Sequence, residues 1–486
     1  MALVVGVDSS TQSTKVELRD LDTGELIGSA SAPHPTTTPP RSEQDPAAWW
    51  SAFETALAEA ESVAGARGPV EIAAISVAGQ QHGMVVLDEA GAVIRPAKLW
   101  NDTETAPDAG WLLKQLPGGA ADWAAATGSV PVAAFTIAKL SWLHRSEPDN
   151  WARVAKVVLP HDWMTARLSG SLDSGDLAAL TTDRGDASGT GYWSAATGEY
   201  CWDLLSIIDA DRDWSTVVPT VLAPGSAAGT WRGAVVAPGT GDNMAAALGL
   251  GLQHGDAVMS FGTSGTVYAV TAEATADPSG AVAGFASADG RFLPLVCTLN
   301  ATKVTDAAIR LLGVTTAEFD ELAMASDIGA GGLTLLPYLD GERTPNRPKA
   351  TGWLTGLRSD VSREQFARAA VEGVICGLLD GLEALTAISG AMDRVIMIGG
   401  GARSAAYRQT LADLCDLPVV VADADQAVAV GACLQAAATL EHVDTAVIAA
   451  RWGLGETTPV ERSVPSGDAA GAQVRARYGA LRDQTG

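Results

Sequence analysis

Asp242 is a residue whose type and position in the sequence suggest that it could take part in chemistry. It lies in PGTGDNMAAALGLG at 238–251, where a helix is predicted to start, and Asn243 follows it directly. Aspartate is a favoured N-cap residue, because its carboxylate accepts hydrogen bonds from backbone N–H groups at a helix start. The same carboxylate could act as a general base toward a sugar hydroxyl, with Asn243 as a neighbouring hydrogen-bond donor and acceptor. The two interpretations are compatible, and the sequence leaves both open.

Two short turns rich in Ser, Thr and Gly are candidates for phosphate binding. DSSTQSTK at 8–15 and GTSGT at 262–266 each lie between two predicted strands. The N–H groups and hydroxyls of such a turn can surround phosphate oxygens, and Lys15 adds a positive charge. Thr11 and Thr263 lie about half the chain apart, so the two turns could belong to related halves and hold one polyphosphate between them. An ordinary polar hairpin explains either turn taken alone.

A third turn, GGGARS at 399–404, follows the predicted strand VIMI and precedes a helix. Its glycines Gly400 and Gly401 let the backbone come close to a nucleotide, and Ser404 is the predicted N-cap. A plain tight turn between a strand and a helix is the alternative. The segment lacks the G-x-G-x-x-G spacing of dinucleotide-binding proteins.

Polar groups at the end of another predicted strand are candidates for sugar binding. GQQHG at 79–83 places Gln81 and His82 where a strand leaves the sheet, and both side chains could bind hydroxyl groups. A single histidine is nevertheless more often structural. Trp100 could stack on the apolar face of a sugar, although tryptophan is more often part of a core.

These groups must be positioned by mixed strands and helices, which predict an α/β architecture. The segment 3–20 reads as a β-hairpin, and 255–271 repeats its pattern. One helix is predicted from the N-cap Asp45, and a long helix from the N-cap Ser362 with a capping box. The stretch after about Arg451 is rich in Gly, Pro, Thr and Ser and is predicted to be peripheral, with one last helix.

The length of the chain predicts two domains. A chain of 486 residues exceeds the size at which one hydrophobic core stops growing. We expect domains at 1–247 and 248–486, with a boundary near 245–255 and a ligand cleft between them.

Composition excludes several classes of protein. The formal net charge of −25 has no basic patch to offset it, which argues against binding to nucleic acid or to an anionic membrane. An anionic nucleotide would need local attraction from N–H groups, helix N-termini and a metal ion. The five cysteines are widely spaced without a C-x-x-C pair, so we expect reduced, mostly buried thiols. No apolar run is long enough for a membrane span and no signal peptide is evident, so a cytosolic location is expected.

Taken together, the motifs make the sequence resemble the FGGY family of carbohydrate kinases over residues 3–440. The motifs that carry the resemblance occur in the order DSSTQSTK, GQQHG, RPAKLWND, LPHDWMTARLSG, GDN, SFGTSGT, LPYLDGERTP and IGGGARS. The family implies a two-domain, actin-like fold with a ribonuclease H-like sheet in each domain. Within the family, the motifs are most similar to those of bacterial kinases of D-xylulose. That similarity implies transfer of phosphate from ATP, with Mg²⁺, to give D-xylulose 5-phosphate.

The resemblance also implies roles for single residues. Asp242 becomes the catalytic base, and Asp8 the carboxylate near the metal ion that accompanies ATP. Sugar contacts are implied or expected for Gln81, His82, Asn243 and Trp100, and ATP contacts for Thr11, Lys15, Gly262, Thr263, Gly400 and Gly401.

Two departures and two rival functions remain. Gln81 stands where many relatives have methionine, and LWND continues as TET at 103–105 where an arginine often follows two residues later, so no ion pair of that arginine is expected.

A kinase for ribulose, fuculose, gluconate or glycerol is the first rival, since a few hydroxyl contacts decide the sugar. A nucleotide-dependent sugar sensor or actin-like scaffold without turnover is the second. A homodimer is compatible with the sequence, which does not fix the oligomeric state.

Overall fold

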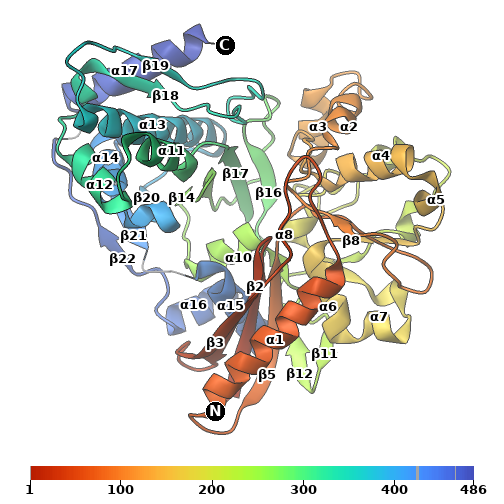
Figure 1. Ribbon diagram of the computed structural model, residues 1–486. Helices are drawn as coiled ribbons and strands as arrows, with labels where there is room; N and C mark the ends of the chain where they lie inside the picture. The colour runs from red at the N-terminus through yellow and green to blue at the C-terminus, as the bar shows by residue number, and fades with distance from the viewer. Residues whose placement is uncertain (1, 423–425, 466, 486) are drawn as a thin grey trace.

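The computed structural model describes residues 2–422, 426–465 and 467–485 and contains two large mixed β-sheets. Figure 1 shows the two sheets in separate halves of the molecule. The first sheet is built from β1 (Ala2–Ser9), β2 (Ser13–Asp20), β3 (Leu26–Pro33), β5 (Glu71–Gly79), β11 (Gly229–Trp231), β12 (Ala234–Val236) and β13 (Thr240–Gly241). The second is built from β14 (Asp256–Phe261), β15 (Gly265–Ala269), β16 (Ala283–Ala286), β17 (Phe292–Thr298), β20 (Arg394–Ile398), β21 (Val419–Ala422) and β22 (Thr457–Pro459).

Each sheet repeats one arrangement. β1 pairs antiparallel with β2 and parallel with β5, while β14 pairs antiparallel with β15 and parallel with β20. Both predicted hairpins are therefore confirmed, and the turns at 10–12 and 262–264 occupy corresponding places. The short pairs β4 (Glu43–Gln44) with β7 (Ala97–Lys98), β6 (Val85–Leu87) with β8 (Lys156–Val158), β9 (Thr181–Asp183) with β10 (Thr220–Leu222), and β18 (Thr334–Leu336) with β19 (Trp353–Thr355) lie outside the two sheets.

Three helices begin where the predicted capping residues place them. Asp45 caps α1 (Pro46–Gly65), Ser362 opens α13 (Arg363–Ser389) with a capping box, and Ser404 caps α14 (Ala405–Leu414). The other helices of the first half are α2 (Ala106–Leu112), α3 (Ala120–Thr127), α4 (Thr136–Ser146), α5 (Pro148–Trp151), α6 (Pro160–Ser169), α7 (Ser171–Ser174), α8 (Arg184–Ala187) and α9 (Trp202–Ser206). Later in the chain follow α10 (Asp242–Gly249), α11 (Thr302–Leu312), α12 (Thr316–Met324), α15 (Ala427–Glu441), α16 (Thr445–Arg451) and α17 (Ala469–Gln484).

Each sheet has its own buried core. The first sheet packs against α1 and α6 through Trp49, Phe53 and Trp163, and the second packs against α13 and α14 through Ile375 and Leu411. Burial of these apolar side chains supplies the main driving force for folding of each half.

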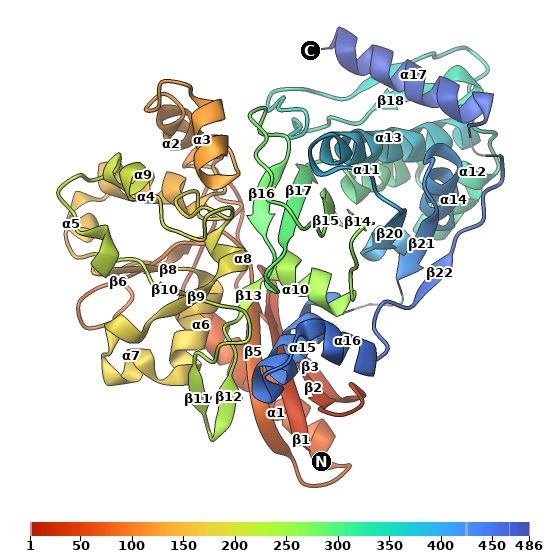
Figure 2. The same cartoon turned by 180° about the vertical axis from the view of Figure 1, so that it is seen from behind.

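Two helices connect the halves. α15 follows a strand of the second sheet but packs against β1 and β5 of the first, and it also packs closely against α10. A Cβ atom at Gly249 would lie 1.9 Å from the carbonyl oxygen of Ala427, and one at Gly431 would lie 1.8 Å from that of Ala245. Figure 2 shows α10 and α15 where the two halves meet. The division into 1–247 and 248–486 stays a prediction.

The prediction that the segment after Arg451 is peripheral is wrong. β22 extends the second sheet beside β21, and α17 buries Val474, Tyr478 and Leu481 against the second core. The spacing of these three residues places them on one face of a helix. The polar composition around them concealed that face. The last helix itself is confirmed.

The sequence also predicts reduced cysteines and no membrane-spanning segment. All five cysteines are free, and Cys376, Cys415 and Cys433 are buried. Among the residues that the structure describes, no helix is both long and apolar enough to cross a membrane.

Candidate active site

The two candidate catalytic carboxylates lie at the carboxyl ends of neighbouring parallel strands. β1, β5 and β13 run parallel, with Asp8 beside Ala78 and Ala78 beside Thr240. Asp242 follows β13 directly, as the first residue of α10. In open α/β sheets, ligands bind outside the carboxyl ends of the strands. The topology therefore brings Asp8 and Asp242 to the edge where a ligand is expected.

Both carboxyl groups have raised pKa values. Burial raises the pKa of Asp242 to about 7, and the negative charges of Asp8 and Asp186 add to the rise. Burial likewise raises the pKa of Asp8 to about 6, although the ammonium group of Lys15 opposes the shift. A carboxylate whose pKa lies near neutral pH is well suited to accept a proton in a reaction.

The prediction that Asp242 caps a helix is wrong. The N-cap of α10 is Gly241, and Asp242 is already helical. Its Oδ1 accepts hydrogen bonds from the backbone N–H of Asn243 at 2.8 Å and from Asn243 Nδ2 at 3.0 Å. The carboxylate therefore binds the backbone N–H and the side chain of the neighbouring asparagine from within the first turn, and does not cap the helix from the residue before it.

Gln81 and Asn243 meet beside Asp242. Asn243 Nδ2 donates a hydrogen bond to Gln81 Oε1 at 2.8 Å, which leaves the Gln81 amide nitrogen Nε2 facing the same region. That nitrogen is buried and has no hydrogen-bond partner among the described residues, and the same holds for Asp8 Oδ1 and His82 Nδ1. Buried polar atoms in native proteins are nearly always hydrogen-bonded. Atoms of this kind at one sheet edge fit a polar ligand.

His82 lies where the two halves meet. Its backbone has φ of 66°, a left-handed conformation that is uncommon for a residue with a side chain. Its ring is 4.9 Å from that of Phe135 and 5.5 Å from that of Phe285, which belongs to β16 of the second sheet. Burial holds the pKa of His82 well below its usual value, with further contributions from Lys139 and Arg343. The ring is therefore neutral and can both donate and accept a hydrogen bond.

A second buried histidine, His161, connects α6 with α8 through carboxylates on both helices. His161 is fully buried on α6, with Nδ1 2.8 Å from Asp186 Oδ2 and Nε2 3.0 Å from Asp162 Oδ1. Burial alone would lower the pKa of His161, but Asp162, Asp186 and Asp183 more than reverse this and raise it to about 9. The ring is therefore an imidazolium at neutral pH.

The carboxylates around His161 reach the candidate site. Burial raises the pKa of Asp186 and the His161 ring opposes the rise, while the negative charge of Asp186 in turn helps to raise the pKa of Asp242. Asp183 caps α8 and accepts a hydrogen bond from Thr240 Oγ1 at 2.7 Å. Sequence reasoning missed the roles of Asp183, Asp186 and His161. The segment 159–170 was singled out, but nothing in its composition shows that the histidine is buried among three carboxylates.

The first hydroxyl-rich turn is held by side chains from other segments. Thr11 Oγ1 donates to Gln80 Oε1 at 3.1 Å and accepts from Trp100 Nε1 at 2.8 Å, while Gln44 Nε2 donates to the Thr11 carbonyl oxygen at 2.9 Å. Trp100 is 41% exposed and therefore not a core residue. Lys15 lies opposite Asp8 across the hairpin.

The second turn and the glycine turn lie side by side. β14 and β20 are parallel neighbours, so the turns that follow them share one sheet edge. Gly262 and Thr263 are exposed, and their carbonyl oxygens accept hydrogen bonds from the N-terminal end of α11. A Cβ atom at Gly401 would lie 2.7 Å from the Cβ of Phe261, so glycine allows this close approach. Gly400 is exposed beside it.

The departure at 103–105 has a structural counterpart. Glu104, where the resemblance implies arginine, lies 2.8 Å from Lys98 Nζ and 3.2 Å from Arg41 Nη2. An acidic residue with two cationic partners therefore occupies this position.

Comparison with known proteins gives this arrangement a family. The chain matches the N-terminal domain of the FGGY family of carbohydrate kinases over residues 3–249 and the C-terminal domain of the same family over 257–440. The chain belongs to the FGGY family. It is therefore a carbohydrate kinase, and the family implies ATP, a small-molecule sugar and a divalent metal ion.

Relatives of this FGGY kinase cover nearly the whole chain. It is 46% identical to a xylulose kinase of Streptomyces coelicolor, over 93% of this chain and 90% of that one. It is 33% identical to a xylulose kinase of Escherichia coli, over 85% and 84%. The crystal structure of a xylulose kinase from Bifidobacterium adolescentis is 40% identical and superposes with a TM-score of 0.85 over 99% of each chain. The predicted two-domain, actin-like α/β fold is confirmed.

Proposed function

We propose that this FGGY kinase phosphorylates D-xylulose at its C5 hydroxyl with Mg²⁺-ATP. The observation that carries the proposal is Asp242, a half-buried carboxylate with a raised pKa at the carboxyl ends of the first sheet. Similarity to xylulose kinases over most of the chain supports the choice of sugar.

Asp242 accepts the hydroxyl proton in the proposed reaction. As the proton leaves, the C5 oxygen forms a bond to the γ-phosphorus, and the bond to the bridging oxygen breaks, so that ADP leaves with the electron pair. Phosphoryl transfer of this kind depends mainly on positioning and on charge stabilisation. A positioned base contributes ~10²–10⁴-fold to the rate of such reactions.

Asp8 is the proposed carboxylate for the metal ion that accompanies ATP. Its buried Oδ1 has no partner among the described residues, and carboxylate oxygens are preferred ligands of Mg²⁺. When bound, the ion neutralises charge on the phosphates. The raised pKa of Asp8 fits a site that is completed by a cation.

The remaining candidate residues divide between the two substrates. We assign Gln81 and His82 to the sugar hydroxyls, because each has a buried polar atom without a partner among the described residues, and Asn243 because it binds both Gln81 and Asp242. Trp100 binds Thr11 of the first turn, and its contact with the sugar stays a prediction. The proposed ATP contacts are Thr11, Gly262, Thr263, Gly400 and Gly401, in turns that follow strands of both sheets, and Lys15, which lies on β2. A cytosolic location and a homodimer stay predictions.

The test is release of ADP by the purified protein with Mg²⁺-ATP and D-xylulose. Turnover should be sugar-dependent and well above background, with Asp242→Asn as the inactive control. Ribulose, fuculose, gluconate and glycerol should give lower kcat/KM. If another sugar of this panel is preferred, the xylulose proposal fails. Binding of sugar and nucleotide in calorimetry without ADP release would favour the sensor.

A further inference from the structure

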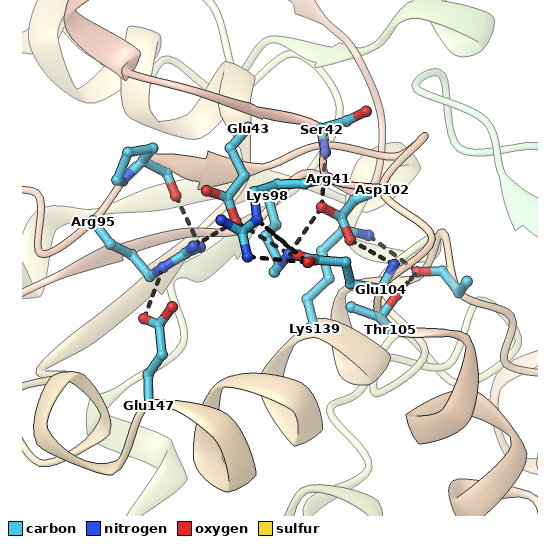
Figure 3. A network of polar contacts seen from close by, with 12 residues as sticks. Arg41, Ser42, Glu43, Arg95, Lys98, Asp102, Glu104, Thr105, Lys139 and Glu147 are labelled. Atoms are coloured by element: carbon cyan, nitrogen blue, oxygen red, sulfur yellow. Dashed lines mark hydrogen bonds and ion pairs between the residues drawn. The ribbon is translucent and has the colours of Figure 1, made fainter. Parts of the chain in front are cut away.

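A cluster of buried charges lies beside the first turn, centred on Lys98. Figure 3 shows this cluster, in which the Lys98 ammonium group is fully buried. Its Nζ lies 3.1 Å from Glu43 Oε1, 2.8 Å from Asp102 Oδ2 and 2.8 Å from Glu104 Oε2. The same nitrogen lies 3.9 Å from the ring centroid of Trp142. One cation therefore joins three acidic side chains from two separate segments.

Outer ion pairs complete the cluster. Arg41 binds Glu104, and Arg95 bridges Glu43 at 2.6 Å and Glu147 at 2.9 Å. The carboxylates of Glu43, Asp102 and Glu104 are close enough together to resemble a metal site. The ammonium group of Lys98 lies among them, however, and supplies the positive charge that a metal ion would bring.

The cluster fastens two short strands to each other. Glu43 and Lys98 are direct partners in the antiparallel pair β4–β7. Asp102 Oδ2 also accepts the backbone N–H of Ser42 at 2.9 Å, and Leu99 donates its N–H to the Ser42 carbonyl oxygen. The strand that contains Glu43 and the loop that follows Lys98 are thereby held at one fixed separation.

Each of these two segments provides one hydrogen bond to Thr11. Gln44 directly follows Glu43 and binds the Thr11 carbonyl oxygen at 2.9 Å, while Trp100, two residues after Lys98, binds the Thr11 hydroxyl at 2.8 Å. Thr11 is thus held on its backbone and on its side chain by the two segments that the ion cluster joins.

We propose that the Lys98 cluster, with Glu104 as its outer carboxylate, positions the first phosphate turn through Trp100 and Gln44. Lys98 and Glu104 are positioning residues, since neither contacts the turn itself. This inference rests on the proposed function only where it assigns Thr11 to ATP. The conformation of the turn at 8–15 in the ligand-free protein does not depend on that assignment.

The variants are chosen so that the fold survives. Removing Lys98 would leave three carboxylates around a buried site without a compensating charge, which is strongly destabilising. Glu104→Gln keeps the shape of the side chain and removes one charge at a position that is 22% exposed. Trp100→Phe keeps the ring and removes the N–H donor. Arg153→Gln is the matched control, because Arg153 forms an ion pair with Asp88 and is 52% exposed.

The first measurement is hydrogen exchange of the peptide that contains 8–15, in the protein without ligands. Exchange should be at least several-fold faster in Glu104→Gln and in Trp100→Phe and unchanged in Arg153→Gln. Unchanged exchange in both test variants, with a lower melting temperature alone, would overturn the proposal. If Glu104→Gln does not fold, Arg41→Gln removes the exposed partner of Glu104 and should give a smaller change in the same direction.

The second measurement is steady-state kinetics of the single and double variants. Each single change should raise the KM for ATP several-fold, and Glu104→Gln should leave the KM for the sugar unchanged. The double variant should be less impaired than the product of the two single effects, because both act through Thr11. Independent, multiplicative effects would contradict the proposal. Absence of turnover in the unaltered protein would instead refute the proposed function, and hydrogen exchange alone would then decide the positioning role.

Discussion

Thr240, which lies two residues before Asp242, donates a hydrogen bond from its hydroxyl group to the carboxylate of Asp183. Asp183 also caps α8 through the N–H groups of Gly185 and Asp186. One carboxylate therefore joins the strand before the proposed base to the helix that carries Asp186. Because the charge of Asp186 helps to raise the pKa of Asp242, the strand before the proposed base and the helix beside it share one buried connection.

Thr240→Val should weaken this connection while preserving side-chain shape. Loss of a hydrogen bond to a charged group costs about 1.5–3 kcal/mol of unfolding free energy. We expect kcat to fall roughly tenfold, since misplacement of a reacting group by about 1 Å can cost ~10²-fold. Denaturant unfolding and steady-state kinetics test this, with the exposed Thr55→Val as control. Equal kcat for both variants would contradict it.

Asp242→Asn should lose turnover without losing stability. The folded-state pKa of about 7 lies above the usual value of 3.8, so the ionised carboxylate is disfavoured by folding. Its destabilising effect develops as the pH rises from about 3.8 and is complete above 7. At pH 8 the melting temperature should therefore equal or exceed that of the unaltered protein, while kcat falls by ~10²–10⁴-fold. Asp360→Asn, at an exposed position, should change neither value.

The pH dependence of kcat/KM for the sugar should report the same carboxylate. The base must be ionised in the free enzyme, so activity should rise with pH through an apparent pKa near 7. The profile should be measured from pH 5.5 to 8.5 at saturating ATP and metal ion. If kcat/KM does not change with pH across that range, no group with a pKa near 7 has to be deprotonated for activity, and the prediction is contradicted.

His161→Gln tests the buried imidazolium. Its pKa of about 9 exceeds the usual 6.5, so its stabilising effect is complete below about 6.5 and is lost as the pH rises through 9. The difference in unfolding free energy between the unaltered protein and the variant should therefore be largest near pH 6 and shrink toward pH 9. Spectra of ¹⁵N-labelled histidine should show both ring nitrogens of His161 protonated at pH 7. A neutral ring there would refute the assignment.

Gly431→Ala should separate α15 from α10. The added Cβ would lie 1.8 Å from the backbone oxygen of Ala245, so one helix must move. Overpacking of this kind costs about 1–3 kcal/mol or more. Gly110→Ala is the control, because nothing lies within 4 Å of its Cβ position. That change should stabilise by about 0.5–1 kcal/mol, since alanine favours a helix over glycine. Thermal unfolding distinguishes the two.

Local signals in the sequence were enough for much of the fold. The hairpins, the caps at Asp45, Ser362 and Ser404, and the strand ends that carry Asp8 and Gln81 follow from neighbouring residues alone. Such patterns depend on interactions within a few positions.

Long-range contacts were out of reach of the same reasoning. His161 and Asp186 come from separate helices, and nothing in either segment shows that they meet in a buried site. Glu104 was noticed as a departure, but its partner Lys98 could not be found without the fold. The apolar face of α17 is hard to detect in the sequence, because the polar residues around Val474, Tyr478 and Leu481 mask their helical spacing.

The contact between Phe285 and His82 has a consequence for how such an enzyme can be divided. The ring from the second sheet forms one wall around a residue on the proposed sugar side. A fragment that ends near residue 249 would lack that wall, although it would keep Asp8, Gln81 and Asp242. Under the proposed function, sugar recognition is therefore a property of the joined halves, and exchange of one half between related enzymes is expected to alter the proposed sugar site together with the proposed nucleotide site.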